Sequence, residues 1–208
     1  MSEKQTESRH RKTFVFTLAR GVFWLLSHTV TPVRYEGAEK LNREGPWILI
    51  SNHVSGWDPM VVGSPVKCQE IVFLGKKELT RNPIGGWVVK KLHMISVDRH
   101  STDMEAMRAC IRALKEGEVL GFFPEGTRHH EGVMQTVESG IALIALRAKV
   151  PMRPVYVDRP LRLFRVTRVR VGDEIPTADL SEAGINQDTI SQLIARIQES
   201  YRGLTEKT

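Results

Sequence analysis

The stretch Trp47-Ile48-Leu49-Ile50-Ser51-Asn52-His53-Val54-Ser55-Gly56-Trp57-Asp58-Pro59 combines a short apolar run, a polar cluster and a helix start. The run from Trp47 to Ser51 is typical of a strand inside a sheet. Asp58 followed by Pro59 favours a helix start, with Asp58 as N-cap and Pro59 in the first helical position. A strand that passes through a polar loop into a helix predicts an α/β fold.

The rest of the chain alternates between strand-like and helix-like segments. Strands are expected at 33–37, 71–74, 94–97, 119–123 and 154–157, and helices at 83–89, 104–114, 137–148 and 188–204. A capping-box pattern from Thr102 to Glu105 marks the start of the second of these helices. We therefore predict a mixed, largely buried sheet flanked by helices in one domain, 32–208, after a helical N-terminal segment, 1–31.

Composition places the chain among globular proteins with an anionic partner. The 208 residues are 41% hydrophobic and 26% charged, which suits one domain with a sizeable core. A net charge of +6 favours nucleic acid, a phosphorylated substrate or an acidic membrane surface. Nucleic acid ranks last because no aromatic stacking cluster or binding motif accompanies the charge. Cys68 and Cys110 lack any metal-ligand spacing, so we expect buried thiols in a reducing, cytosolic setting.

The N-terminal segment joins basic residues to an apolar run. Lys4, Arg9, Arg11 and Lys12 precede the run from Phe14 to Leu26, which Arg20 interrupts. The run is shorter than the roughly 20 apolar residues of a membrane crossing, and no small-residue cleavage site follows it. We favour a helix that lies in the membrane interface over a core helix of a soluble domain.

Arginines recur between 159 and 170, where they alternate with apolar residues. Arg168 and Arg170 would share one face of a strand, with Val169 and Val171 on the other. A solvated edge strand protected by charge and an anion-binding face explain this pattern equally well.

The polar cluster at 52–58 has the composition of a catalytic centre. His53 and Asp58 are separated by four residues, and Gly56 allows the loop to bring the carboxylate to the imidazole. Such an imidazole is a poised base near neutral pH. The alternative is that Asp58 only caps the following helix, which leaves His53 unexplained.

Further polar clusters follow other predicted strands. Asp98 and Arg99 follow the strand at 94–97, and Glu125 and Arg128 follow the strand at 119–123. Loops at one edge of a parallel sheet meet, so these clusters and His53 are expected to form one site.

Together these clusters resemble strongly the glycerolipid acyltransferases that make phosphatidic acid from lysophosphatidic acid. The resemblance rests on Asn52-His53 with Asp58, Gly86 to Asp98-Arg99, Phe123-Pro124-Glu125-Gly126-Thr127-Arg128, and Val150 to Val155. It spans about residues 30 to 175. The combination of these motifs is far more specific than the His/Asp pattern alone.

The resemblance implies a role for each site residue. His53, oriented by Asp58, would be the general base that activates the acceptor hydroxyl. Arg99 and Arg128 would bind the glycerol phosphate, with the small turn Gly126-Thr127 bringing backbone N–H groups close to it. Glu125 would orient a glycerol hydroxyl or hold Arg128. No metal and no cofactor are expected, and His129-His130 is interpreted as a solvated loop.

The implied reaction is transfer of a fatty acyl group from acyl-CoA or acyl-carrier protein to the sn-2 hydroxyl of 1-acylglycerol-3-phosphate. The expected partners are this lysophospholipid, the acyl donor and an anionic membrane surface at the cytoplasmic face, to which the protein binds as a peripheral or monotopic protein. Many family members have lysines before the glycine of the helix that follows the Phe-Pro-Glu motif, where this chain has Glu138-Ser139-Gly140. Another lysolipid or polar alcohol is therefore an alternative acceptor, and a non-catalytic lipid-binding module is the alternative of another class.

Overall fold

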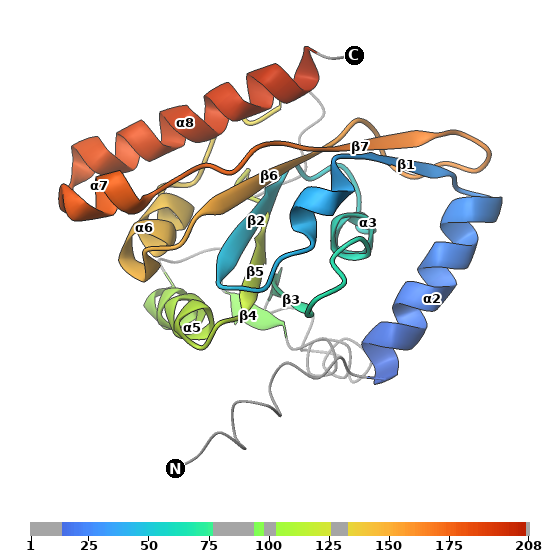
Figure 1. Ribbon diagram of the computed structural model, residues 1–208, viewed down its shortest axis with the longest axis horizontal. Coiled ribbons are helices and arrows are strands. Elements are labelled where there is room, and N and C mark those ends of the chain that lie inside the picture. The colour runs from blue at the N-terminus through green and yellow to red at the C-terminus, as the bar shows by residue number, and fades with distance from the viewer. Residues whose placement is uncertain (1–13, 77–93, 98–102, 126–132, 207–208) are drawn as a thin grey trace.

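A single mixed sheet organises the computed structural model, which describes residues 14–76, 94–97, 103–125 and 133–206. In this part of the chain seven strands are arranged in the order β1-β7-β6-β2-β5-β3-β4 (Figure 1). Strands β2 to β6 run parallel to one another, whereas β7 is antiparallel to β6 and β1 is parallel to β7. The strands are β1 (Val33–Glu36), β2 (Trp47–Ser51), β3 (Ile71–Lys76), β4 (Ile95–Val97), β5 (Val119–Phe122), β6 (Met152–Val157) and β7 (Thr167–Val171).

Helices cover both faces of the sheet (Figure 1). The first face packs on α5 (Met104–Lys115), α6 (Ser139–Ala148) and α8 (Gln187–Thr205), with the short α7 (Ala178–Glu182) beside them. The second face packs on α3 (Asp58–Gly63), the 3₁₀ helix η1 (Ala38–Leu41) and α2 (Phe14–Thr29). The expected α/β fold, with a mixed sheet flanked by helices, is confirmed.

The central strands are apolar throughout because both of their faces are covered. Every residue of β2 and β5 is buried. Ile48 and Ile50 belong to the core on the α5, α6 and α8 side, and Trp47 and Leu49 belong to the opposite core. This arrangement is the usual reason why parallel strands lack a polar face.

Strand direction brings several loops to one edge of the sheet. In the parallel pairs Ile50 lies beside Phe122 and Ser51 beside Val155, so the chain leaves β2, β5 and β6 at the same edge. Because β7 and β1 run the opposite way, the β6–β7 loop and the C-terminal end of α2 also lie at this edge. We call it the carboxyl edge.

Two expected helix starts shift by one residue. Helix α3 begins at Asp58, with Trp57 at the cap position and no side chain capping the helix. The N-cap of α5 is Asp103, whose side chain accepts a hydrogen bond from the Ala106 N–H at 2.9 Å. Thr102 and the helix expected at 83–89 lie outside the described residues.

Of the two explanations offered for the alternating arginines, the solvated edge strand is wrong. Strand β7 lies between β1 and β6, so it is interior to the sheet. Arg168 is exposed, but Arg170 is buried, where it pairs with Glu36 at 3.1 Å and donates to the Leu204 carbonyl oxygen at 3.1 Å. Cys68 is likewise exposed rather than buried, whereas Cys110 is in the core.

Helix α2 presents apolar side chains to the outside. Phe23 is buried against the second face of the sheet. Leu18, Val22, Trp24, Leu25 and Leu26 are exposed. Among the described residues, no helix is both long and apolar enough to span a bilayer. That α2 lies in a membrane interface stays a prediction.

Candidate active site

His53 follows β2 at the carboxyl edge, and its imidazole is fixed by Asp58. His53 Nδ1 lies 2.7 Å from Asp58 Oδ2. The buried carboxylate also accepts hydrogen bonds, each of 2.7 Å, from the N–H groups of Val54 and Ser55 and from the Ser55 hydroxyl. The carboxylate of Asp58 therefore turns back onto its own loop, and it holds the imidazole rather than capping α3.

The hydrogen bonds of Asp58 set the tautomer of His53. A carboxylate that accepts from every other neighbour is an acceptor for Nδ1 as well, so the Nδ1 atom carries the proton. Nε2 is then the basic nitrogen, and in the described part of the chain no group bonds to it. The imidazole side chain is 13% exposed, which leaves a narrow approach for a hydroxyl group.

Glu125 holds the main chain on either side of the site. Its Oε2 accepts the His53 N–H at 3.0 Å, and its Oε1 accepts the Met134 N–H at 2.8 Å. Glu125 follows β5, so it clamps the loop after β2 to the segment that returns before α6. Sequence reasoning missed this role, because a backbone N–H partner leaves no pattern in the residues.

Aromatic rings support the imidazole from one side. Phe123 stacks on His53 with ring centroids 4.5 Å apart, and Phe73 stacks on Phe123 with centroids 6.0 Å apart. The Phe73 ring occupies the space beside Gly121, where an added Cβ would lie 2.3 Å from a ring carbon. Glycine at this position of β5 therefore allows the ring column to form.

The side chains of Asn52 and Tyr201 bond to the main chain at the ends of β2 and β6, next to the site. The Asn52 side chain bonds to both the N–H and the carbonyl oxygen of Val157, at 2.8 and 2.9 Å. The Tyr201 hydroxyl reaches the carbonyl oxygens of Ile50 and Val155, at 2.8 and 3.1 Å. Burial raises the pKa of Tyr201 well above its usual value. Sequence reasoning placed Tyr201 on a packing helix and did not find this contact.

Of the residues expected at the site, His53, Asp58 and Glu125 lie together in the structure. Arg99, Gly126, Thr127 and Arg128 lie outside the described residues, so their part in the site stays a prediction. The anion-binding alternative for the arginines after β6 does not apply to Arg170, which is committed to internal contacts.

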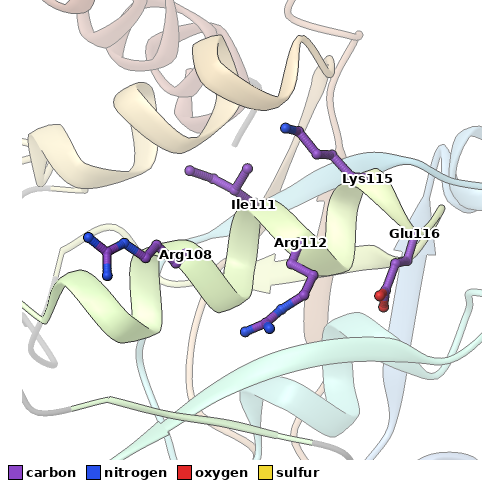
Figure 2. Close-up of a pocket in the computed structure, with 5 residues that line it drawn as sticks. All are labelled: Arg108, Ile111, Arg112, Lys115 and Glu116. Atoms are coloured by element: carbon purple, nitrogen blue, oxygen red, sulfur yellow. The ribbon is translucent and has the colours of Figure 1, made fainter.

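A separate shallow hollow of about 410 Å³ lies on the outer side of α5. Figure 2 shows the side chains around it, which come from this helix and from Glu116 at its C-cap. They are Arg108, Ile111, Arg112, Lys115 and Glu116. His53, Asp58 and Glu125 do not line it, so among the described residues the hollow is separate from the His53 site.

A histidine oriented by a buried carboxylate at the carboxyl edge of a mixed sheet is a site for base-assisted group transfer. A family model described as acyltransferase matches residues 32–158, and the chain belongs to this acyltransferase family. The match covers the whole of the His53 loop and the Glu125 segment.

Individual proteins similar to this chain are also named as acyltransferases. The chain is 31% identical over 201 residues to the 1-acyl-sn-glycerol-3-phosphate acyltransferase of Streptococcus pneumoniae, which covers 93% of this chain and 74% of the relative. It is 31% identical over 155 residues to the enzyme of the same name from Bacillus subtilis, covering 72% and 76% of the two chains. The fold is similar to a crystal structure of the 1-acyl-sn-glycerophosphate acyltransferase from Thermotoga maritima, with a TM-score of 0.63, 22% identity, and coverage of 91% and 77%.

Proposed function

We propose that this acyltransferase moves a fatty acyl group from acyl-CoA or acyl-carrier protein to the sn-2 hydroxyl of 1-acylglycerol-3-phosphate. The product is phosphatidic acid. The observation that carries the proposal is the 2.7 Å hydrogen bond from His53 Nδ1 to a buried, otherwise satisfied Asp58 carboxylate. The named activities of the bacterial relatives support the choice of acceptor.

In the proposed mechanism His53 first accepts a proton from the acceptor hydroxyl and then donates it to the leaving group. Nε2 takes the proton of the acceptor hydroxyl as the oxygen attacks the thioester carbonyl carbon. The tetrahedral intermediate collapses, the carbon–sulfur bond breaks, and the leaving thiolate takes the proton from Nε2. Asp58 stabilises the imidazolium between these steps, so no covalent acyl-enzyme is needed.

Binding of the acceptor phosphate is assigned to Arg99 and Arg128, as the family resemblance implies. The turn Gly126-Thr127 would present backbone N–H groups to the same phosphate. Glu125 has a different role in this proposal, because both of its oxygens bond to main-chain N–H groups. It places the His53 loop and does not contact the glycerol.

The protein would work at the cytoplasmic face of a membrane, with an anionic lipid surface as its partner. The exposed apolar side chains of α2, with Phe23 anchoring the helix to the domain, support an orientation in the interface plane. Replacing Leu18, Val22 and Leu25 by serine keeps Phe23 in place. We expect this triple variant to move from the membrane to the soluble fraction of a lysate, and an unchanged partition would refute the anchor.

Another lysolipid or polar alcohol is the second candidate acceptor. It is favoured by Glu138, which is exposed immediately before α6, where many family members have basic residues. Only the acceptor differs between the two candidates, because the His53 and Asp58 geometry serves either.

The decisive experiment is an acyl-transfer assay of purified protein against a panel of lysolipids, with acyl-CoA and acyl-carrier protein as donors. We expect transfer to 1-acylglycerol-3-phosphate to be the fastest. His53→Asn is the matched variant, since its amide N–H replaces Nδ1 as donor to Asp58 while the base is lost. We expect it to fold normally with activity at least about a thousandfold lower. Retained transfer in His53→Asn would refute the base mechanism.

A further inference from the structure

The β6–β7 loop ends in a tight turn that exposes adjacent apolar side chains. The Arg165 N–H bonds to the Arg162 carbonyl oxygen at 3.3 Å, so Leu163 and Phe164 are the central residues of the turn. Their exposed fractions are 66% and 78%. An isolated surface leucine would need no explanation, but a leucine and a phenylalanine together at a loop tip indicate a surface that is covered in use.

Phe164 also has a strained backbone. Its φ of +57° lies in the left-handed region, where the central position of such a turn normally has glycine. Because Phe164 is 78% exposed, the contacts of its ring within the domain offset little of this strain. An observed outlier of this kind, in a bulky residue, points to a function for the side chain.

The turn is held against the C-terminal end of α2. The Phe164 N–H donates to the Val30 carbonyl oxygen at 2.7 Å, directly after the helix. Figure 1 shows the tip of the β6–β7 loop beside this end of α2. The apolar turn and the apolar outer side of α2, which includes Leu25 and Leu26, therefore occupy the same end of the molecule.

Exposed arginines surround the apolar pair. Arg159, Arg162 and Arg165 are exposed, and Arg159 also bonds to the neighbouring Asp158 at 3.1 Å. Within the described part of the chain, Arg162 and Arg165 form no ion pair. Apolar side chains at a tip, flanked by free guanidinium groups, complement the boundary between acyl chains and anionic headgroups.

The turn lies at the edge of the sheet that holds the catalytic histidine. Its loop begins after Val157, whose main chain bonds to the side chain of Asn52, the neighbour of His53. Trp57, in the His53 loop, is 60% exposed at the same edge. A membrane that contacts the turn would therefore lie against the carboxyl edge, where an amphiphilic acceptor enters.

We propose that the Arg162–Arg165 turn is a second membrane contact, in which Leu163 and Phe164 enter the interface of an anionic bilayer and the arginines bind lipid phosphates. The inference rests on the proposed membrane location. It adds to α2 a second contact, next to the C-terminal end of that helix, and the two contacts together fix the orientation of the carboxyl edge on the lipid surface. The flanking cations favour an anionic bilayer over an apolar groove of a protein partner. They also disfavour a second copy of this chain, because its net charge of +6 would repel them.

Lipid titrations of the full-length protein test the proposal. The partition coefficient onto vesicles of phosphatidylcholine with phosphatidylglycerol would be measured by co-sedimentation for the wild type and for Leu163→Ser/Phe164→Ser. We expect a roughly tenfold weaker partition for the double variant, because buried apolar area at the interface is lost. Ile185→Ser is the matched control, since Ile185 is another exposed apolar residue, in the connection between α7 and α8 away from α2 (Figure 1). It should partition as the wild type does.

Two further variants separate lipid binding from folding and charge. Phe164→Gly relieves the backbone strain, so we expect thermal unfolding about 2–4 °C higher together with weaker partition. Arg162→Glu/Arg165→Glu should remove the preference for anionic over neutral vesicles. Unchanged partition in Leu163→Ser/Phe164→Ser and in Phe164→Gly would overturn the proposal, as would loss of self-association without any change in partition.

The same variants distinguish this inference from the proposed function. Vesicle partition requires no turnover, so a wild type that binds vesicles through the turn but acylates no lysolipid would refute the function alone. If the function holds, Leu163→Ser/Phe164→Ser should lose activity several-fold on acceptor embedded in vesicles and retain it on acceptor dissolved in detergent micelles.

Discussion

Asp58 and Glu125 are both buried carboxylates that hold His53, but Asp58 acts on the imidazole and Glu125 acts on the main chain. The donors to Asp58 all come from residues 53–55, in the loop immediately before it. The donors to Glu125 come from His53, 72 positions away, and from Met134 on the far side of its own loop. One carboxylate therefore orients the imidazole of the proposed base, and the other sets the place of His53 relative to the sheet.

This difference separates two kinds of mutational effect. Loss of a local orienting group should reduce turnover more than it reduces stability, because the loop is still attached to β2. Loss of a long-range clamp should reduce both, since it frees the loops at both of its ends. The loss of kcat and the loss of unfolding free energy should therefore be measured in the same variants of Asp58 and Glu125. The ratio of these two losses should be larger for Asp58 than for Glu125.

The largest effect is expected for Asp58→Asn. The amide can leave His53 with the wrong tautomer, and it cannot stabilise an imidazolium, so kcat should fall by about 10²–10⁴. Steady-state kinetics with thermal unfolding in parallel would measure both quantities.

Asp179→Asn is the matched control for that substitution. The hydrogen bond from Arg196 lowers the pKa of Asp179 to about 2, so this surface carboxylate is ionised throughout an assay range near neutral pH. It lies on α7, away from the carboxyl edge, and its substitution should leave kcat unchanged. A similar loss of kcat in both variants would contradict a specific role for Asp58.

Glu125→Gln should give a smaller loss of activity and a larger loss of stability. One carboxylate oxygen becomes an amide N–H₂ group that faces a backbone N–H, which costs about 1–3 kcal/mol of folding free energy. We expect kcat to fall by about 10- to 100-fold as His53 moves from its position. Urea unfolding and steady-state kinetics would measure these changes. Normal stability with a raised KM for the acceptor would instead show that the carboxylate binds substrate.

Phe123→Leu should weaken the support of the imidazole without removing any hydrogen bond. Aromatic pairs contribute about 0.5–1.5 kcal/mol beyond the area they bury, so we expect a comparable loss of stability and a fall in kcat of about three- to tenfold. The substitution leaves the donors to Asp58 and Glu125 in place. An unchanged kcat would mean that Asp58 alone holds the plane of the imidazole.

The smallest effect on turnover is expected for Tyr201→Phe, which leaves kcat within about twofold while unfolding becomes easier by about 1 kcal/mol. Burial raises the pKa of Tyr201 in the folded state. The stability that depends on the neutral hydroxyl is therefore present below the unfolded pKa of about 10 and is lost as pH rises above it. Urea unfolding between pH 8 and 11 should show this alkaline loss reduced in Tyr201→Phe, and an identical pH dependence would contradict it.

The strands and the His53–Asp58 pair could be predicted because their signals are local. An apolar run such as 47–51 and a histidine followed by an aspartate are visible in a few consecutive residues. The clamp formed by Glu125 could not be predicted, since its partners are backbone N–H groups that every residue except proline carries. The stacking of Phe123 on His53 depends in the same way on distant parts of the chain.

The arginines of β7 show why an alternating pattern did not decide the strand's position. Alternation reports that one face of a strand is polar, but it does not report what covers that face. Here β1 pairs with the free side of β7, and the end of α8 supplies a carbonyl oxygen to Arg170. The same residues would suit a solvated edge in a protein without β1 and α8.

Gly121 has a consequence for anyone who wishes to alter this enzyme. The residue contacts neither His53 nor any expected substrate group, yet a methyl group there would displace Phe73, and Phe73 supports Phe123 against the imidazole. In a deep mutational scan for activity, position 121 should therefore be as intolerant as a residue that touches the reactants. Libraries aimed at new acceptors should hold Gly121, Phe73 and Phe123 constant and vary the loops beyond the carboxyl edge.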